Sequence, residues 1–466
     1  TRTMVNETPK LIGKEVRLAG FVHSVRHHGK LIFMDLRDRS GVVQVVLNKG
    51  IDSEAFETAK KLTDESSIQI TGKVNKRPET LVNNKIDTGA VEIGITNLTV
   101  YSLCKSLPFP VDSDGLEIDE ELRLKYRYLD LRRKRLTDNL RFRSRLVQLA
   151  REYLFKNDFC EIETPLLTKS TPEGSRDFIV PSRLQPGNFY ALPQSPQQYK
   201  QLLMVAGFER YFQIAKCLRD EDLRADRGFE HTQVDLEMSF VEREDVMAMV
   251  EGLIIFVVET LGGKILNKPF PVFTYDEAMK KFGADKFDTR NDKEKKDGLN
   301  AFAWVVDFPF FEKDKEGDWT FTHNPFSDPV PEHKQDFLNG QIEGIKTTQY
   351  DLVWNGCEAG GGSIRSHEPE VLKRVFEVLG YRDDKIQEQF GHMLEAFTFG
   401  VPPHGGLALG VDRLAMLLRG EKSLKEVIAF PMNSKGKTAV MDAPSKVEEN
   451  QLSELGIKIE SDKEKL

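Results

Sequence analysis

The stretch that decides the fold is GGLALGVDRLAMLL (405–418). A glycine-rich apolar strand runs directly into a helix, and Arg413 lies one turn inside that helix. A cation in the first turn opposes the helix dipole, so helix stability alone disfavours it. The conflict disappears if Arg413 and the helix N-terminus both face a phosphate group. The alternative is an arginine that simply extends into solvent.

A second arginine closes another strand, in YFQIAKCLRDE (211–221). The residues before Arg219 alternate between apolar and polar, and the polar loop 222–228 follows. Two arginines from distant segments, each at the end of a strand, favour a shared phosphate ligand over two unrelated surface residues.

Composition sets limits on the class of protein. The chain has 466 residues, enough for two or three domains, and 39% hydrophobic with 30% charged residues is typical of a soluble globular protein. No apolar run approaches the roughly 18 residues that span a membrane, and no signal peptide opens the chain. We therefore expect a protein without membrane association.

The four cysteines are far apart and form no CxxC pair, which makes a zinc site or a disulfide framework unlikely on spacing alone. A reducing cytoplasmic location fits this usage best. The net charge of −8 argues against nucleic-acid binding by the whole surface. It leaves room for a local basic patch at 123–145, which is either a solvated helix face or a contact for a polyanion.

The first 105 residues are rich in short β-type runs, at 16–22, 31–36, 42–47, 68–74 and 91–101. A helical stretch, 53–62, separates the third run from the fourth. Five strands with a helix in this place predict an OB-fold barrel, a frequent reader of single-stranded nucleic acid.

Three residues of the predicted barrel suit unpaired RNA bases. Phe33 offers a stacking surface, Gln44 an amide for base edges, and Arg26 a cation for phosphate. The alternative for Phe33 is a place in the barrel core.

After the barrel we expect a hinge at 106–135 and then a domain at 136–435 built on a large, mainly antiparallel sheet flanked by helices. Helices are predicted at 136–157 and 241–261, and a strand at 160–165. The charged stretch 291–298 is typical of a linker or a truncated insertion. Residues 436–466 form a polar C-terminal extension. The fold class is therefore α+β.

The segment YDLVWNGCE (350–358) contains Asn-Gly between two apolar runs, a strong two-residue hairpin signal. That turn would pair Val353 with Glu358 and place Asp351 and Glu358 as diagonal neighbours on one face. Two carboxylates plus phosphate oxygens are the usual ligands of Mg²⁺. A pair of carboxylates without a metal is the alternative.

Other polar groups would suit a small amino acid. Glu173 lies in TPEGSRD (171–177), a segment typical of a mobile flap. Asp235 shares a strand face with Gln233 and Glu237, and these groups could hold an ammonium. Lys200 and Arg365 offer cations for a carboxylate. No serine–histidine–aspartate or cysteine–histidine order indicates nucleophilic catalysis.

These motifs resemble those of the class II aminoacyl-tRNA synthetases. The helix and strand ending at Pro165 resemble motif 1, residues 212–237 resemble motif 2, and 405–418 resemble motif 3. More narrowly, the chain is similar to the bacterial-type aspartyl-tRNA synthetases along nearly its whole length. The segments that carry this closer resemblance are RLKYRYLDLRR (123–133), TPEGSRD (171–177), ALPQSPQ (191–197) and GGGSIR (360–365).

The resemblance implies that ATP and aspartate bind on the antiparallel sheet and form aspartyl-adenylate, which then esterifies tRNA-Asp. Arg219 and Arg413 would be the catalytic cations. The implied aspartate site comprises Glu173, Ser195, Gln197, Lys200, Arg219, Asp235, His323 and Arg365. The implied ATP site comprises Arg219, Asp220, Glu221, His231, Glu358, Gly410, Val411, Asp412 and Arg413.

The same resemblance assigns Mg²⁺ to Asp351 and Glu358 and predicts a homodimer formed through motif 1. The barrel would read the anticodon of tRNA-Asp, with the residues Arg26, His28, Phe33, Gln44 and Glu92.

The chain departs from the family pattern in three places. Bacterial members carry a further domain between motifs 2 and 3, whereas only 288–300 bridges that gap here. Gly228 stands where an amide usually contacts adenine, which puts that contact in question. His28 stands where strict tRNA-Asp readers often carry leucine, and enzymes that also charge tRNA-Asn often carry histidine. Relaxed tRNA choice is therefore a hypothesis.

Three rival functions remain open. A lysine or asparagine enzyme of the same fold is one, although Lys200 and Arg365 would repel a lysine substrate. An inactive OB-fold RNA-binding paralogue is the second, although Arg219, Glu221 and Arg413 are intact. A synthetase paralogue that makes an amide from free amino acids is the third, and the complete barrel weighs against it.

Overall fold

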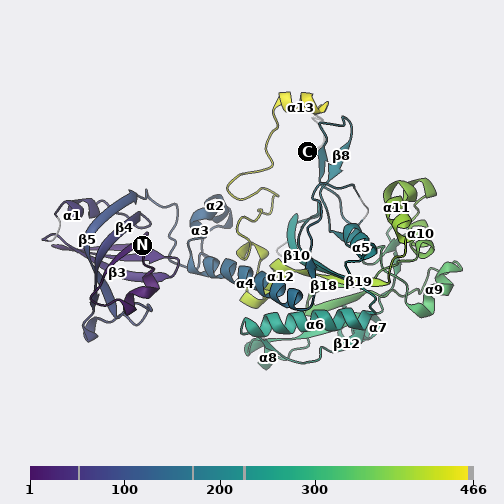
Figure 1. Cartoon of the computed structure of the whole chain (residues 1–466), viewed down its shortest axis with the longest axis horizontal. Helices are drawn as coiled ribbons and strands as arrows, with labels where there is room; N and C mark the ends of the chain where they lie inside the picture. Colours follow the sequence, from purple (N-terminus) through teal and green to yellow (C-terminus); the bar gives the residue numbers. More distant parts are fainter. Residues whose placement is uncertain (51–52, 171–172, 224–226, 460–466) are drawn as a thin grey trace. The chain divides into compact units, whose positions relative to one another are not determined.

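The computed structural model describes residues 1–50, 53–170, 173–223 and 227–459. The chain divides into two compact units, residues 1–115 and 116–466, which are coloured purple to blue and blue to yellow in Figure 1. Each unit has its own hydrophobic core.

The first unit is a closed barrel with the strand order β1-β2-β3-β5-β4, which confirms the predicted OB fold. Alternate residues of each strand, such as Ile32, Met34 and Leu36, point inward and form its core. The elements are η1 (Val5–Lys10), β1 (Glu15–His28), β2 (Leu31–Asp38), β3 (Gly41–Asn48), α1 (Ser53–Ala59), β4 (Ser67–Lys76), η2 (Glu79–Leu81) and β5 (Val91–Ser102).

The second unit is built on a sheet that has eight strands among the described residues. Its two outermost pairs, β12 with β14 and β6 with β9, are parallel, and every pair between them is antiparallel. In spatial order the strands are β12 (Val272–Thr274), β14 (Phe302–Val306), β17 (Tyr350–Trp354), β18 (Cys357–Ile364), β19 (His404–Gly410), β10 (Glu230–Ser239), β9 (Arg210–Leu218) and β6 (Cys160–Glu161).

Three helices cover one face of this sheet: α4 (Lys134–Lys156), α6 (Arg243–Thr260) and α12 (Val411–Arg419). In Figure 1 α6 lies below the sheet, whereas α5 (Gln197–Val205) lies above it. The inward residues of α4, among them Leu146, Leu149 and Leu154, recur at helical spacing and pack against β9 and β10. The opposite face of the sheet is left for polar side chains.

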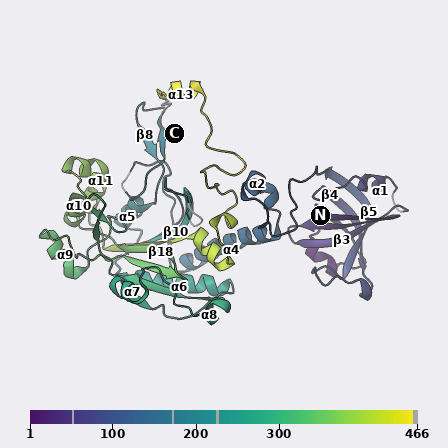
Figure 2. The same ribbon diagram turned by 180° about the vertical axis from the view of Figure 1, so that it is seen from behind.

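The remaining elements lie around the sheet. Helices α9 (Pro331–Leu338), α10 (Pro369–Val378) and α11 (Asp383–Phe397) gather at one end in both views (Figures 1 and 2). The others are α2 (Glu120–Lys125), α3 (Arg127–Asp130), β7 (Ile179–Pro181), β8 (Phe189–Ala191), β11 (Lys264–Ile265), α7 (Tyr275–Phe282), α8 (Asp292–Lys296), β13 (Leu299–Asn300), β15 (Phe311–Lys313), β16 (Trp319–Phe321), η3 (Leu424–Glu426) and α13 (Glu449–Leu455).

Two predicted elements differ from the structure. The strand predicted at 160–165 is only β6, because the chain leaves the edge of the sheet after the hydrogen bond from Ile162 N to Phe212 O. The predicted linker at 291–298 contains the short helix α8. Its first turn is closed by reciprocal hydrogen bonds between Asn291 and Glu294, a capping box that stabilises a helix start.

The basic patch at 123–145 is in large part a buried charge cluster. Asp130 is fully buried and accepts hydrogen bonds from Arg123, Arg127 and Arg133, which are also buried. Arg123 reaches Glu426 as well, at 2.9 Å. These three guanidinium groups are therefore occupied inside the protein, and the polyanion interpretation is wrong for them.

Candidate active site

A cavity of about 390 Å³ lies on the polar face of the sheet. It is lined by residues from α5, β10, β18, β19 and α12 and from the loop after β9, segments that are widely separated in the chain. Most of the predicted ligand-binding residues line it together: Glu173, Ser195, Gln197, Lys200, Arg219, Glu221, His231, Asp235, His323, Glu358, Arg365, Gly410, Asp412 and Arg413. The predicted residues Asp220, Asp351 and Val411 do not.

Strand alternation explains why so many polar groups meet here. On β10, Val234 and Leu236 enter the core beneath the sheet, so Asp235 and Glu237 face the cavity. On β19, Leu407 and Leu409 likewise enter the core. Gly406, which precedes Leu407, leaves space for the neighbouring carboxylate, because a Cβ there would lie 2.1 Å from Glu237 Oε2.

The predicted cations for a carboxylate are buried and already paired. Arg365 donates from Nε to Glu237 Oε1 at 2.8 Å and from Nη2 to Glu237 Oε2 at 3.1 Å. Lys200 Nζ lies 2.7 Å from Asp235 Oδ1 and 3.1 Å from Glu237 Oε2. Burial on its own raises the pKa of Glu237, but the charges of Arg365 and Lys200 outweigh it and hold that pKa at about 2. Glu237 is therefore a carboxylate beneath two cations.

One oxygen of this cluster has no partner. Asp235 Oδ2 is buried and accepts no hydrogen bond from the described residues. Burial raises the pKa of Asp235, and the charge of Lys200 only partly offsets it. A buried acceptor without a donor is unfavourable by roughly 1–3 kcal/mol, so a donor brought by a ligand would be stabilised here.

The predicted ammonium-binding groups lie beside this oxygen on the cavity wall. Ser195 donates to Glu173 Oε2 at 2.6 Å, and Gln197 donates to Gln201 at 2.9 Å. Gln201 is in turn 3.1 Å from His404 Nε2, in a buried hydrogen-bond chain. Of the predicted flap 171–177, residues 171 and 172 lie outside the described residues.

The end of the cavity beside motif 2 is strongly positive. Arg219 Nε is buried and has no hydrogen-bond partner among the described residues. Burial, together with the charges of Arg219, Arg413 and Lys216, lowers the pKa of His231 to about 3. His231 is therefore a neutral imidazole. Glu221 is held from two sides, by the Ser175 hydroxyl and, at 3.6 Å, by Arg227.

Arg413 is the third residue of α12, as predicted, and Gly410 caps that helix. Its Nη1 donates to the main-chain oxygen of Glu358 at 2.6 Å, so motif 3 and the β17–β18 hairpin are joined there. The guanidinium also lines the cavity.

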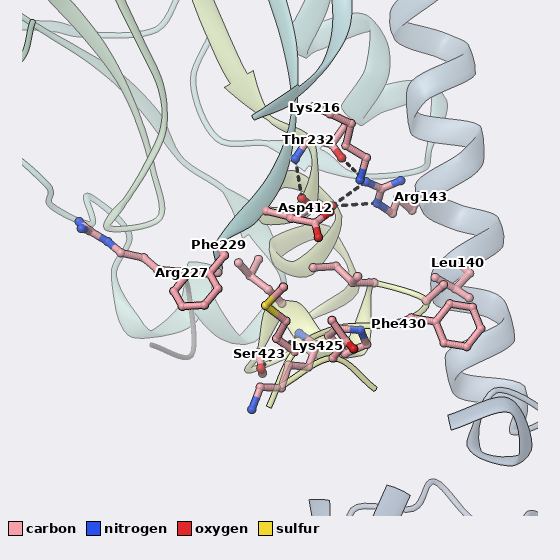
Figure 3. A pocket seen from close by; sticks show the side chains of 18 of the residues that line it. Leu140, Arg143, Lys216, Arg227, Phe229, Thr232, Asp412, Ser423, Lys425 and Phe430 are labelled. Carbon is pink, nitrogen blue, oxygen red and sulfur yellow. Dashed lines mark hydrogen bonds and ion pairs between the residues drawn. The ribbon is translucent and has the colours of Figure 1, made fainter. Parts of the chain in front are cut away.

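The other predicted ATP residues of α12 have different surroundings. Asp412 accepts hydrogen bonds from Arg143 at 2.7 Å and from Thr232 N at 2.9 Å, and Figure 3 shows both groups pointing at it. Val411 is buried in the main core, so only its main chain is free to meet a ligand. Asp220 lies 3.7 Å from Arg176 outside the cavity.

Next to the turn the hairpin has the predicted register, with Val353 opposite Glu358 and Trp354 opposite Cys357. A register shift between Leu352 and Val353 then places Asp351 opposite Gly361, one residue farther along β18 than the predicted turn implies. Asn355 and Gly356 both have positive φ, as this turn requires. Asp351 accepts a hydrogen bond from Gln349 and lies 3.2 Å from His323 Nε2. Burial lowers the pKa of His323, but the hydrogen bond to Asp351 and the charges of Asp351 and Glu358 together raise it overall.

The two predicted metal ligands influence each other. Burial and the nearby charge of Glu358 raise the pKa of Asp351, although the hydrogen bond to His323 opposes them. Burial raises the pKa of Glu358, but the charge of Lys286, whose Nζ lies 2.8 Å away, lowers it overall. The described residues contain no group of three or more typical metal ligands. Two carboxylates on paired strands are oxygen ligands of the kind that Mg²⁺ takes together with phosphate oxygens, and Glu358 is the one that lines the cavity.

A second, larger cavity of about 980 Å³ lies between α4, the loop after β9 and residues 428–438 (Figure 3). Its lining is mainly apolar, with Leu140, Phe229 and Phe430 among its walls. Of the predicted site residues only Asp412 borders it, so the chemistry is expected in the smaller, polar cavity.

The predicted anticodon residues share one surface of the barrel. Phe33 points outward, between the core residues Ile32 and Met34, so the alternative of a core position is wrong. His28 packs edge-on against Phe33 at 5.7 Å, and Arg26 is the cross-strand partner of Phe33. On the neighbouring strands Gln44 donates to Glu92 at 3.0 Å.

Two residues were missed or given another role in the sequence analysis. Glu237 was grouped with ammonium-binding carboxylates, whereas the structure pairs it with Arg365. Strand alternation had placed it on the correct face, but its partner is 128 residues away in the chain. Lys286, beside Glu358, lies in a segment that carried no recognisable motif.

Comparisons with known proteins show the family to which the chain is related. A family model described as tRNA synthetases class II (D, K and N) matches residues 119–434, and an OB-fold nucleic acid binding domain matches residues 16–100. The aspartate–tRNA ligase of Macrococcus caseolyticus is 39% identical, over 97% of both chains. The aspartate–tRNA(Asp/Asn) ligase of Dictyoglomus turgidum is 40% identical, over 98% of this chain and 97% of that one.

Among solved structures, the asparaginyl-tRNA synthetase of Pyrococcus horikoshii in complex with asparaginyl-adenylate superposes with a TM-score of 0.75. It is 25% identical and covers 93% of this chain and 98% of its own. The alignment to the Macrococcus protein spans 576 positions, more than the 466 residues of this chain, so that relative carries residues that have no counterpart here. No helix among the described residues has the length and apolar character needed to cross a membrane.

Proposed function

The chain belongs to the class II tRNA synthetases of the aspartate, lysine and asparagine group, and we propose that it is an aspartate–tRNA ligase. The observation that carries this proposal is the pair of unsatisfied buried atoms in one cavity, Arg219 Nε and Asp235 Oδ2. One is a cationic donor and the other an anionic acceptor. The ammonium of an amino acid would donate to Asp235 Oδ2. Its carboxylate, while it is being joined to a phosphate, would accept from Arg219 Nε.

In the proposed aspartate complex, the ammonium contacts Asp235 Oδ2. It faces the part of the cavity wall formed by Glu173, Ser195 and Gln197. The side-chain carboxylate lies against Lys200 and Arg365. Glu237 supports this arrangement, because its negative charge keeps two buried cations close together before the substrate enters.

Selectivity against asparagine follows from the same geometry. Asparagine would leave Lys200 and Arg365 without the anion that they are arranged to bind. Sites built around a specific polar group reject analogues that lack it by roughly 10⁴-fold or more.

The α-carboxylate of aspartate attacks the α-phosphorus of ATP, and pyrophosphate leaves with the electron pair of the broken P–O bond. Arg219 holds the α-phosphate, and Arg413 holds the terminal phosphate. Both contribute by positioning and charge neutralisation, since no side chain need become covalently attached. A ribose hydroxyl of the terminal tRNA adenosine then attacks the aspartyl carbonyl, loses its proton and forms the ester, while AMP leaves with the electron pair of the broken anhydride bond.

The base of ATP would lie beside Glu221 and stack on the neutral ring of His231. Gly410 and Val411 are assigned main-chain contacts, because the side chain of Val411 is buried in the core. Asp412 acts indirectly by fixing the start of α12 to Arg143 and Thr232, and Asp220 by its contact with Arg176.

We assign Mg²⁺ to Glu358 and Asp351, where it would neutralise the phosphate chain and the leaving pyrophosphate. His323 keeps Asp351 oriented through its 3.2 Å contact and closes the cavity beside the substrate.

We assign the anticodon of tRNA-Asp to the barrel surface formed by Arg26, His28, Phe33, Gln44 and Glu92. Phe33 offers a partly exposed ring for stacking, and Arg26 lies across from it. The histidine at position 28, which packs on that ring, supports the broader proposal that tRNA-Asn is also aspartylated.

We propose that the enzyme acts in the cytoplasm as a homodimer that associates through the motif 1 region. Large apolar side chains, Phe155, Leu166 and Leu167, are each about half exposed at the end of α4 and after β6. A second copy of the same surface would cover them. Sedimentation of the purified protein should give twice the chain mass, and Leu166→Asp should shift it toward the monomer.

One assay series tests the activity. ATP–pyrophosphate exchange with a panel of amino acids should respond to aspartate and fail with asparagine and lysine. Charging purified tRNA-Asp and tRNA-Asn then decides the breadth of tRNA choice. Exchange that depends on another amino acid would overturn the assignment, and an uncharged tRNA-Asn would restrict it to tRNA-Asp.

A further inference from the structure

Lys286 lies at the outer side of the proposed metal and pyrophosphate site, in the segment between α7 and α8. Its Nζ is 2.8 Å from Glu358 Oε2. The main-chain oxygen of the same Glu358 accepts a hydrogen bond from Arg413. Glu358 is therefore held between two cations, of which Arg413 lines the cavity and Lys286 approaches from outside it.

The backbone around Lys286 is anchored. Phe287 is buried, and its ring stacks on Phe282 with centroids 3.9 Å apart. Asp288 is held by Arg290 through two side-chain contacts, at 3.0 and 2.9 Å. The hairpin turn packs against this segment, since a Cβ on Gly356 would lie 3.6 Å from Asp288 Cβ. These contacts fix the backbone of the segment that carries Lys286, so the lysine is held next to Glu358.

The negative charges of Asp351 and Glu358 explain why a lysine is placed here. Asp351 is buried, and it lies on β17, the strand paired with the β18 strand that carries Glu358. Two neighbouring carboxylates require a nearby cation to remain charged together. Before a metal arrives, the ammonium of Lys286 supplies that cation. Lysine suits a temporary contact better than arginine does, because it is a compact charge on a flexible stem.

We propose that Lys286 stands in for the divalent ion in the nucleotide-free enzyme and moves to the β- and γ-phosphates when ATP binds with its metal. The proposal rests on the proposed function, because it requires a metal–nucleotide substrate. Glu358 is released to the metal, and the ammonium follows the departing pyrophosphate. Lys286 remains protonated throughout, so no proton is exchanged.

A surface ion pair with no role is the competing explanation, since such pairs contribute only about 0–1 kcal/mol. Lys295 provides a matched control on the same segment. It lies 3.7 Å from Asp288, and its side chain is exposed to a similar degree, 47% against 41% for Lys286.

The experiment compares Lys286→Met, Lys286→Arg and Lys295→Met. Without nucleotide, Lys286→Met should bind Mn²⁺ about 10-fold more tightly by electron paramagnetic resonance titration, because the competing cation is gone. In exchange assays its KM for MgATP and for pyrophosphate should rise about 10-fold, while its KM for aspartate stays within about twofold. Lys286→Arg should restore most of the phosphate affinity.

Opposite changes in Mn²⁺ and pyrophosphate affinity separate this role from a structural one. A loss of both affinities, or equal behaviour of Lys286→Met and Lys295→Met, would overturn the proposal. Failure of the proposed function would appear differently, as an absence of aspartate-dependent exchange in the unmodified enzyme. The Mn²⁺ titration needs no turnover and tests Lys286 in either case.

Discussion

Two clusters of cations and carboxylates in the second unit have similar composition but different surroundings. One is buried inside the protein, and the other lies at the cavity. The closed cluster consists of Arg123, Arg127, Arg133, Asp130 and Glu426, all buried inside the protein. Its arginines meet a central carboxylate at distances of 2.7 to 3.1 Å.

The open cluster consists of Arg219, Arg365, Arg413, Lys200 and Glu237, and all but Glu237 line the cavity. Glu237 is shared by Arg365 and Lys200, and Arg219 keeps a buried nitrogen that has no hydrogen-bond partner in the part of the chain that the structure describes. Nearly all buried donors in proteins have a hydrogen-bond partner. An exception in a cavity wall is therefore a place where a ligand can accept the missing hydrogen bond. The comparison predicts that charge removal from the closed cluster affects stability, whereas removal from the open cluster affects chemistry.

The largest effect is expected at Arg365, the residue common to substrate binding and internal pairing. Arg365→Gln should lower kcat/KM for aspartate in the exchange assay by roughly 10⁴-fold. It should also destabilise the fold by about 3–5 kcal/mol, because Glu237 loses its bidentate partner.

A double variant, Glu237→Gln with Arg365→Gln, separates these two effects. It leaves no lone buried charge, so it should regain much of the stability and still fail to activate aspartate. Normal aspartate activation by a folded double variant would break the assignment of the open cluster. Arg243→Gln, which removes a half-buried ion pair with Asp307, serves as the control.

Asp130→Asn tests the closed cluster. Removing the charge shared by three guanidinium groups should lower the free energy of unfolding by about 3–5 kcal/mol in chemical denaturation. In the protein that remains folded, KM for ATP and for aspartate should stay within about twofold. Asp138→Asn, which removes a surface pair with Lys134, should cost less than about 1 kcal/mol. A changed KM with unchanged stability would contradict the division between the clusters.

Local patterns predicted much of this architecture. The barrel strands have period-two alternation, and the Asn355-Gly356 turn carries its register in two residues. Strand alternation also placed Asp235 on the correct face. These signals depend on neighbours along the chain, so one sequence is enough to read them.

The pairing of charges could not be predicted in the same way. Glu237 meets Arg365 from 128 residues away, and Arg123 meets Glu426 from 303 residues away. A run of basic residues therefore looked like a surface for a polyanion until tertiary structure supplied its carboxylates. Lys286 lacked any local signal, because its position depends on the buried ring of Phe287.

Arg219→Gln sharpens the comparison by removing a cation that no internal carboxylate requires. Loss of one preorganised donor to developing charge should reduce aspartate-dependent exchange by roughly 10²–10³-fold. The midpoint of thermal unfolding should stay constant or rise, because a buried nitrogen without a partner disappears. Arg382→Gln, on the exposed start of α11, should change neither quantity. A large drop in the unfolding midpoint would place Arg219 with the closed cluster instead.

The smallest effect concerns His231, which reports the uncompensated charge of the open cluster. Its pKa is about 3 in the folded protein, through burial and the charges of Arg219 and Arg413, against about 6.5 in the unfolded chain. Below pH 6.5 the unfolded chain takes up a proton that the folded protein refuses, so stability falls as the pH is lowered.

The loss of folding stability caused by His231 should be absent above pH 7 and should reach about 1 kcal/mol at pH 5.5. His404, whose pKa burial lowers to about 4, adds a loss of the same sign, but it is present in both proteins of the comparison. Comparing the denaturation of the unmodified protein with that of His231→Asn between pH 5 and 7.5 therefore isolates the stability loss caused by His231. Parallel pH profiles would mean that burial and the two arginines do not lower the pKa of the imidazole. A difference that shrinks when ATP is added would show that the phosphates supply the charge that the open cluster lacks.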